Sequence, residues 1–187
     1  YARVQRGHKT RIVNAWQKRG KVTAMTGDGV NDAPSIKNAD IGIGMGITGT
    51  DVTKNVADMI LADDNFATIV SAAAEGRRIY DNIRKAIQFL LAANLSEVLA
   101  IFFATLLGFT VFKPVQLLWI NLITDCFPAL ALGMEKPEDD VMKREPRDSK
   151  EGIFAGGLGF AVIYQGILVT LITLISYFIG SFIENGA

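Results

Sequence analysis

The sequence predicts an α/β domain with a parallel sheet, followed by an all-helical region of membrane spans. Up to about residue 85, short apolar runs alternate with charged segments of helical pattern, which is typical of a parallel α/β unit. From about residue 86 onward, long apolar runs alternate with short polar loops. A run of roughly 20 apolar residues is long enough to cross a bilayer. The 187 residues suffice for one ordinary domain or slightly more.

The first predicted element of the α/β unit is a helix. We expect it to run from about His8 to Lys18, and Gly20 is well placed to end it. The helical spacing of its apolar residues predicts a buried face, formed by Ile12, Ala15 and Trp16.

The rest of this unit alternates between strands and short helices. Such alternation favours a parallel sheet of the Rossmann type, in which ligands collect at the carboxyl ends of the strands. Proline suits the first turn of a helix, and threonine suits a helix N-cap. The expected order is a strand at 21–25, a helix from about Pro34, a strand at 41–45, a helix at 50–57 capped by Thr50, and a strand at 58–62.

A turn rich in carboxylates and glycines follows the first predicted strand, in the segment T-G-D-G-V-N-D-A-P. Asp28 and Asp32 supply hard oxygen ligands of the kind that Mg²⁺ prefers when it is shared with a phosphate. Asn31 can orient a phosphoryl oxygen without adding charge. Gly27 and Gly29 allow backbone angles and close approach that a side chain would prevent. The sequence therefore predicts a turn that binds phosphate and Mg²⁺.

The shorter pattern G-D-G-x-N-D is typical of phosphotransfer domains of the haloacid dehalogenase type. The full segment T-G-D-G-V-N-D-A-P resembles a motif of the P-type ATPases. This resemblance implies part of a Rossmann-like domain of the haloacid dehalogenase type, with ATP as the substrate of the complete protein. Asp28 would then hold Mg²⁺, Asn31 and Asp32 would shape the catalytic site, and Gly27 and Gly29 would lie beside the bound phosphate.

A second part of the resemblance concerns Lys9. In P-type ATPases a lysine in a segment similar to the one from Ala2 to Lys9 contacts the phosphoryl group. An ammonium group there would offset charge on a transferring phosphate. A solvated helix lysine with no role in the chemistry is the alternative.

Composition and charge exclude several classes of protein. The formal net charge is zero, which argues against nucleic acid as a main partner. Cys126 is the single cysteine, so an internal disulfide and a multi-cysteine metal site are excluded. The chain begins at Tyr1 like the middle of a domain, with no signal peptide. We therefore expect a segment of a larger protein.

Three apolar stretches are candidates for membrane spans. One very long helix, with Asn65 as a possible cap, is expected to join the α/β unit to the first span without an intervening proline. The expected organisation is the C-terminal part of a phosphorylation domain at 1–75, a stalk at 76–85, transmembrane helices at 86–112, 113–133 and 153–183, and a cytoplasmic loop at 134–152.

The basic residues predict the orientation of these spans, because cytoplasmic loops carry an excess of Lys and Arg. Only Lys113 lies between the first two spans, and no Lys or Arg follows the third. The basic residues before the first span and in the second loop are Arg77, Arg78, Arg84, Lys85, Lys136, Lys143, Arg144, Arg147 and Lys150. We therefore expect a multi-pass protein of the lipid bilayer, with the α/β unit cytoplasmic. The resemblance implies a bacterial plasma membrane.

Polar residues inside the spans predict an ion site. Asn94 and Glu97 are three residues apart and share a helix face, and Thr124 and Asp125 share a face with Asn121, which they follow by three and four residues. Ionisable residues at membrane depth are costly and usually functional. Polar contacts that only hold helices together are the alternative.

Pro128 strengthens the prediction of an ion site. It lies four residues after Thr124 and cannot donate a hydrogen bond to that carbonyl, so a backbone oxygen is freed beside two side-chain oxygens. Carboxylates, amide oxygens and a free carbonyl are ligands that Ca²⁺ accepts.

These segments also resemble known pumps. The segment N-L-S-E at 94–97 is similar to the fifth membrane helix of Ca²⁺-transporting P-type ATPases, and N-L-I-T-D at 121–125 is similar to the sixth. The resemblance implies Ca²⁺ as the transported ion, with Mn²⁺ or another cation as the alternative.

The same resemblance implies that the chain is incomplete. P-type ATPases transfer the γ-phosphate of ATP to an aspartate in a D-K-T-G-T motif, which this sequence lacks. The partners would be the nucleotide-binding domain, the actuator domain and membrane helices one to four of the same pump, and the segment alone would be inactive. A membrane-anchored phosphatase of the haloacid dehalogenase type and a non-catalytic membrane subunit remain alternatives.

Overall fold

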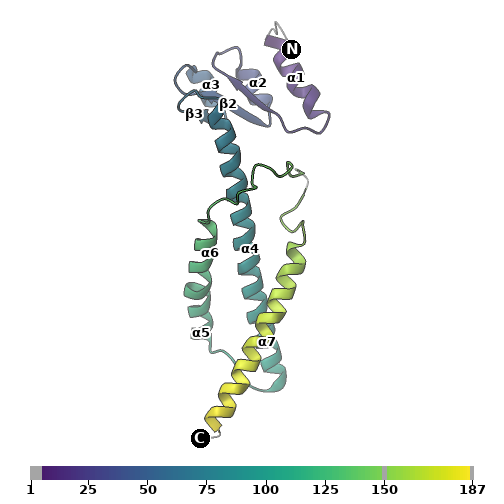
Figure 1. Ribbon diagram of the computed structural model, residues 1–187, viewed down its shortest axis with the longest axis vertical. Coiled ribbons are helices and arrows are strands. Elements are labelled where there is room, and N and C mark those ends of the chain that lie inside the picture. The colour runs from purple at the N-terminus through teal and green to yellow at the C-terminus, as the bar shows by residue number, and fades with distance from the viewer. Residues whose placement is uncertain (1–5, 149–150, 186–187) are drawn as a thin grey trace. The chain divides into compact units, whose positions relative to one another are not determined.

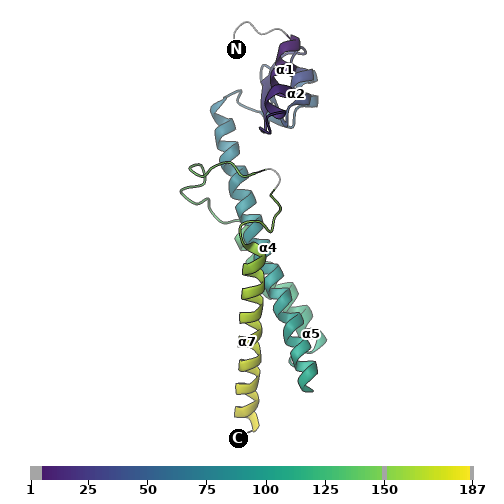
Figure 2. The same ribbon diagram turned by 90° about the vertical axis from the view of Figure 1, so that its right-hand side faces the viewer.

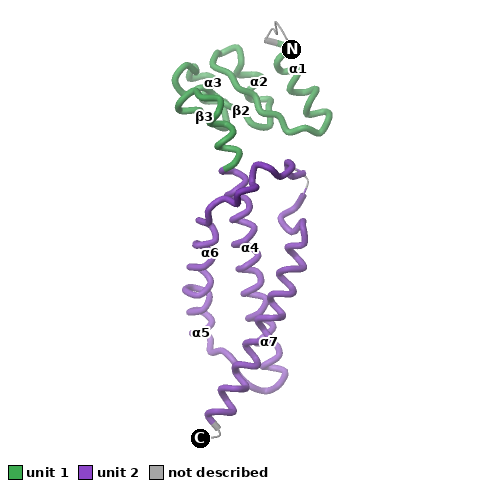
Figure 3. Tube along the Cα trace, in the orientation of Figure 1, with its two compact units in different colours: residues 1–74 green, residues 75–187 purple. Residues whose placement is uncertain are grey.

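The computed structural model describes residues 6–148 and 151–185. The chain forms two compact units, residues 1–74 and residues 75–187 (Figure 3). Figure 1 labels helices and strands of both units.

The first unit contains a three-stranded parallel sheet. Its strands are β1 (Ala24–Gly27), β2 (Ile41–Met45) and β3 (Met59–Leu61), in the order β1-β2-β3. The register pairs Ala24 with Ile41 and Ile43 with Met59. The predicted parallel sheet is therefore confirmed, although β1 lies later in the chain than the strand expected at 21–25.

Short helices connect these strands: α1 (Arg6–Gln17), α2 (Ala33–Asn38) and α3 (Asp51–Val56). Thr50 caps α3 as predicted, because its hydroxyl accepts a hydrogen bond from the backbone N–H of Thr53 at 3.4 Å. Ile36, Ile43 and Leu61 are at most 2% exposed and form the centre of the core. The apolar residues of α2, β2 and β3 thus hold the unit together.

The buried face of α1 differs from the prediction. Val13 is only 5% exposed, whereas Trp16 is 41% exposed and lies below the guanidinium group of Arg19. Val13 shares a face with Lys9 and Gln17, four residues before and after it. Gln17 donates a hydrogen bond to the carbonyl of Asn38 at 3.0 Å. The expectation of a face formed by Ile12, Ala15 and Trp16 was wrong, because contacts with α2 select the other side of the helix.

The second unit contains the helices that are long and apolar enough to cross a membrane. They are α4 (Ala67–Leu107), which begins in the first unit, the continuous helix Pro114–Gly133, and α7 (Leu158–Asn185). The middle helix consists of α5 (Pro114–Trp119), a π-helical turn η1 (Ile120–Asp125) and α6 (Cys126–Gly133). Three membrane-capable helices were predicted, and the structure confirms them.

Helices α4 and α7 lie side by side (Figures 1 and 2). The Thr170 hydroxyl donates to the carbonyls of Gly166 at 2.7 Å and Ser96 at 3.3 Å. A Cβ atom at Gly166 would lie 2.7 Å from a methyl carbon of Leu95. A small residue at this crossing therefore lets the two helices approach closely.

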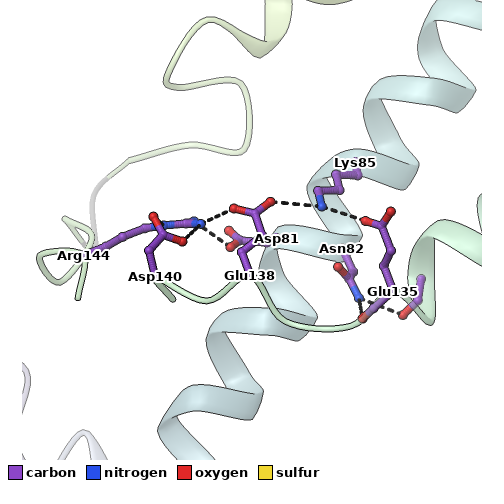
Figure 4. Close-up of polar contacts among 8 residues, drawn as sticks. Asp81, Asn82, Lys85, Glu135, Glu138, Asp140 and Arg144 are labelled. Atoms are coloured by element: carbon purple, nitrogen blue, oxygen red, sulfur yellow. Dashed lines mark hydrogen bonds and ion pairs between the residues drawn. The ribbon is translucent and has the colours of Figure 1, made fainter. Parts of the chain in front are cut away.

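A network of polar contacts fastens the loop after α6 to α4 (Figure 4). Asn82 is 2% exposed, and its amide donates to the carbonyl oxygens of Gly133 at 3.3 Å and Glu135 at 2.9 Å. These contacts satisfy carbonyls at the end of α6 that have no partner in their own helix. Around Asn82, the ion pairs are Lys85 with Glu135 and Glu138, and Arg144 with Asp81, Glu138 and Asp140.

The core of the first unit yields a stability prediction. Replacing Ile36 by Ala should lower the free energy of unfolding by about 2–5 kcal/mol, because it removes a fully buried side chain and leaves a cavity. The control Ile47→Ala alters a side chain that is 71% exposed and should cost less than about 0.5 kcal/mol. Urea unfolding followed by Trp16 fluorescence, with Trp119 replaced by Phe in every protein, measures both; equal losses would contradict this core.

The loop network yields a prediction about pH. Ion pairing with Lys85, and then with Arg144, lowers the pKa of Glu138 below its usual 4.5, and Arg144 lowers the pKa of Asp140 below 3.8. Because the pKa values of these two carboxyl groups are lowered in the folded state, their ion pairs stabilise the fold fully above about pH 5. This stabilisation is lost as the pH falls through the pKa values of the folded state. Hydrogen exchange of residues 134–148, corrected for the intrinsic rate, should therefore become several-fold faster between about pH 5 and pH 3.

Arg144→Gln provides the control for this pH effect. The variant should exchange faster at pH 7 and should show a smaller change on acidification, because the cation common to Asp81, Glu138 and Asp140 is gone. An unchanged pH dependence in Arg144→Gln would show that other groups hold the loop.

Candidate functional site

The carboxylate-rich turn lies between the end of β1 at Gly27 and the start of α2 at Ala33. The backbone N–H of Asp32 donates to the Gly29 carbonyl at 2.8 Å and closes the turn. The Asp32 carbonyl then accepts from the backbone N–H groups of Ser35 and Ile36, both at 2.9 Å. The turn thus passes directly into α2 at the carboxyl end of a parallel strand, which is where such sheets bind ligands.

Lys9 and Asp32 form an ion pair within this unit. The Lys9 ammonium lies 2.5 Å from Oδ1 of Asp32, and Asp32 is 8% exposed. A carboxylate that is buried to this extent needs such a partner. The sequence-predicted site residues Lys9 and Asp32, which are 23 positions apart in the chain, are therefore brought together.

Asp28 and Asn31 present their side chains differently. Both are exposed, and no side-chain partner of either is recorded in the described part of the chain. The backbone carbonyl of Asp28 accepts a hydrogen bond from the Thr50 N–H at 2.9 Å. Asp28 thus has a fixed backbone and a free carboxylate.

These free oxygens fit part of a Mg²⁺ site. Mg²⁺ is commonly held by one or two carboxylates, with waters and phosphate oxygens completing its octahedral shell. Among the described residues there is no group of three or more His, Cys, Asp or Glu side chains that could enclose a metal ion. The Asp28 carboxylate and the Asn31 amide oxygen are available to such an ion, whereas Asp32 is paired with Lys9.

The two glycines of the turn differ in their surroundings. A Cβ atom at Gly27 would lie 2.4 Å from Cβ of Asp32, whereas a Cβ at Gly29 would meet nothing within 4 Å. Neither glycine has a positive φ. The prediction of close backbone approach therefore holds for Gly27 only, and neither position uses the positive φ that glycine allows.

The predicted ion-site residues of the second unit come from α4 and the middle helix. The Asn121 amide donates to Oε2 of Glu97 at 2.8 Å and to the Leu117 carbonyl at 3.1 Å. Asn121 is the second residue of the π-helical turn. Its hydrogen bond therefore places this widened turn against the Glu97 side chain. Turns of this kind are frequent at functional sites.

Two carboxylate oxygens beside this contact have no hydrogen-bond partner among the described residues. They are Oε1 of Glu97 and Oδ2 of Asp125, and both atoms are buried. Asp125 is 4% exposed. Both residues, together with Thr124, line a cavity of about 500 Å³ between α4, the middle helix and α7. Buried anionic oxygens without a donor are the arrangement that a bound cation would compensate.

Asn94 behaves differently from the other predicted ligands. Its side chain is exposed and donates to the carbonyl of Leu90 at 2.8 Å. It is absent from the lining of the cavity that contains Glu97 and Asp125. The structure therefore brings Glu97, Thr124 and Asp125 to one cavity, with Asn121 bonded to Glu97, but leaves Asn94 outside it.

Sequence reasoning missed two polar residues of the second unit. Gln165 of α7 lines it and accepts a hydrogen bond from the Gln88 amide of α4 at 3.1 Å. Asn82 caps the end of α6. The signal that could have found Gln165 is a glutamine in the middle of an apolar span.

Comparison with known proteins shows which proteins this chain is similar to. A family profile described as "Cation transporting ATPase, C-terminus" matches residues 109–187. A calcium-transporting ATPase of Bacillus subtilis is 56% identical over 180 residues, which make up 96% of this chain and 20% of that protein. A calcium-transporting ATPase of Listeria monocytogenes is 59% identical over 96% of this chain and 20% of its own length.

A plant protein is also similar to this chain. The endoplasmic reticulum-type calcium-transporting ATPase 3 of Arabidopsis thaliana is 50% identical over 95% of this chain and 18% of its own length. The chain therefore spans about a fifth of the relatives that it matches. A solved catalytic domain of the CPx-ATPase CopB-B is 38% identical over 38% of this chain with a TM-score of 0.36, a value too low to assign a fold. The sequence matches confirm the resemblance that the motifs predicted.

The crowding at Gly27 yields a prediction. Gly27→Ala should displace the Asp32 side chain, lengthen the Lys9–Asp32 contact and lower the free energy of unfolding by about 1–3 kcal/mol, because the added methyl group overpacks the turn. Gly29→Ala is the matched control in open space and should change stability by less than about 0.5 kcal/mol. Chemical denaturation of both variants measures the difference. Equal stability of the two variants would contradict the packing of Gly27 against Asp32.

Proposed function

We propose that this chain, a segment of a P-type cation-transporting ATPase, supplies part of the phosphorylation site and part of the ion site of an ATP-driven Ca²⁺ pump. The observation that carries the proposal is the pair of buried, unpartnered carboxylate oxygens of Glu97 and Asp125 at one cavity. The names of the relatives support Ca²⁺ as the ion. The parallel sheet and its turn support a phosphotransfer domain of the haloacid dehalogenase type.

In the first unit, the proposed roles follow the contacts. Lys9 neutralises Asp32 and presents a positive charge beside the turn, where it would balance a phosphoryl group. Asp28 and Asn31 offer free oxygens for Mg²⁺, which when bound would offset charge on the phosphate. The tight packing of Gly27 against Asp32 fixes the position of that carboxylate relative to β1.

In the second unit, Glu97 and Asp125 are the proposed anionic ligands of the transported ion, with Thr124 and Asn121 as neutral oxygen donors. The Asn94 amide nitrogen donates to the Leu90 carbonyl and leaves the amide oxygen free, so Asn94 would take part if its side chain turned toward the cavity. Ca²⁺ requires six to eight oxygens, so the other membrane helices of the complete pump would supply further ligands. The same pump would provide the aspartate that accepts the phosphate, because the sequence has no D-K-T-G-T segment.

The distribution of basic residues supports an orientation with the first unit and the loop at 134–152 in the cytoplasm. Helix α4 contains residues of both units. We therefore include in the proposal that α4 transmits the state of the phosphorylation site to Glu97. This part of the proposal rests on continuity of the chain alone.

The test is phosphoenzyme formation by the full-length pump from labelled ATP, titrated with Ca²⁺, Mn²⁺ and Na⁺. Low concentrations of Ca²⁺ should switch phosphorylation on. Loss of a residue that supports a metal ligand typically weakens metal binding by about 10–100-fold. Glu97→Gln and Asp125→Asn remove proposed ligands and should raise the required Ca²⁺ concentration by at least that factor. Glu184→Gln changes an exposed carboxylate on α7 outside the cavity and should have no effect.

The other outcomes of this titration identify the alternatives. Activation by Mn²⁺ but not by Ca²⁺ would reassign the transported ion. Phosphorylation that is indifferent to all three cations, and unchanged in Asp125→Asn, would contradict a Ca²⁺ pump and favour a pump for another ion or a membrane-anchored phosphatase.

A further inference from the structure

The loop that joins β2 to α3 is held by a single carboxylate from elsewhere in the first unit. Oδ1 of Asp64 accepts a hydrogen bond from the backbone N–H of Ile47 at 3.0 Å. Oδ2 accepts from the backbone N–H of Thr48 and from its hydroxyl, both at 2.7 Å. One side chain thus binds two consecutive peptide groups of the loop at residues 46–49.

The same loop has little freedom at either end. The Gly46 N–H donates to the Leu61 carbonyl at 2.8 Å, and a Cβ atom at Gly46 would lie 2.5 Å from that oxygen. A Cβ atom at Gly49 would lie 2.0 Å from the carbonyl oxygen of Met45. Both ends of the loop therefore pack against backbone atoms at the ends of β2 and β3. The segment that Asp64 binds has few alternative conformations.

The far end of the loop reaches the turn that carries Asp28. The backbone N–H of Thr50 donates to the carbonyl oxygen of Asp28 at 2.9 Å. The Thr50 side chain caps α3 at the same time. Because Asp28 has no recorded side-chain partner among the described residues, this backbone contact fixes the position from which its carboxylate projects.

Asp64 has a backbone conformation that its surroundings must maintain. Its φ is +50°, a value that is uncommon for residues other than glycine and that Asp and Asn tolerate best. Hydrogen bonds from Ile47 and then from Thr48 lower its pKa to about 2, so the side chain is an anion at neutral pH. An Asn at this position would tolerate the backbone but would replace one accepting oxygen with an NH₂ group that faces a donor.

We propose that Asp64 is a positioning residue for the Mg²⁺-binding turn: its carboxylate fixes the loop at residues 46–49, and the loop fixes Asp28 through Thr50. This inference rests on the proposed function of Asp28. It makes Asp64 an indirect partner of the metal, and loss of such partners typically weakens metal binding by about 10–100-fold.

The test combines two measurements on the full-length protein. Hydrogen exchange reports the loop, and electron paramagnetic resonance with Mn²⁺ as the probe reports metal binding at the turn as the part of the bound Mn²⁺ that Asp28→Asn loses. Asp64→Asn should accelerate exchange at residues 47–50 and weaken Mn²⁺ binding by about tenfold or more. Asp64→Gly, which accommodates the positive φ without a carboxylate, should do the same and guards against a variant that fails to fold.

The neighbouring Asp63 provides a matched control. Its carboxylate accepts from the Thr68 hydroxyl at 2.7 Å and from the Asn65 N–H at 3.1 Å, at the start of α4. Asp63→Asn removes the same charge and should leave both the loop exchange and the Mn²⁺ affinity unchanged. A variant of Asp64 with a loosened loop but normal Mn²⁺ affinity would overturn the positioning role, and unchanged loop exchange would overturn the anchoring contact.

The Asp28→Asn variant separates this inference from the proposed function. If Asp28→Asn binds Mn²⁺ as the wild type does, Asp28 is no metal ligand and the proposed role of the turn fails. In that case the positioning role of Asp64 fails with it, but the exchange measurement still decides whether Asp64 holds the loop.

Discussion

The membrane part of this chain depends on one constraint, which is the burial of two carboxylates that the described residues only partly satisfy. Glu97 has one oxygen bonded to Asn121 and one without a partner, and Asp125 has an unpartnered oxygen while it is 4% exposed. Burying an ionised carboxylate without compensation costs several kcal/mol or more. A cation in the adjoining cavity would remove this cost, so the burial that costs free energy without an ion would create affinity for the ion.

The surrounding helices contain the features that such a site requires. The π-helical turn at 120–125 places Asn121 against Glu97 and leaves Asp125 at the cavity. Helix α7 approaches α4 closely at Gly166. Asn82 fastens the end of α6 to α4, so the helix that carries Asp125 and the helix that carries Glu97 are tied at a second position. The positions of the carboxylates are therefore fixed by contacts that lie several turns apart.

Much of the fold follows from the sequence, because the residues within short segments determine it. The parallel strands, the Thr50 cap and the three long apolar helices are encoded in short segments, and the sequence predicted them. Features that depend on which surfaces meet were not predictable in this way. The face of α1 is selected by α2 and buries Val13, the Asn94 amide bonds to its own helix, and the buried Asn82 has no signal in a stretch rich in charges. The loop contact of Asp64 is equally invisible in sequence, because its partners lie 16 and 17 residues away.

Equilibrium binding of radioactive Ca²⁺ to the full-length pump, without ATP, tests the account most directly. It measures the ion site independently of phosphate chemistry. The account predicts saturable Ca²⁺ binding at neutral pH that is weakened by about tenfold or more in both Glu97→Gln and Asp125→Asn and unchanged in Glu184→Gln. Undiminished binding in Asp125→Asn would contradict it, because the buried carboxylate would then have no part in holding the ion.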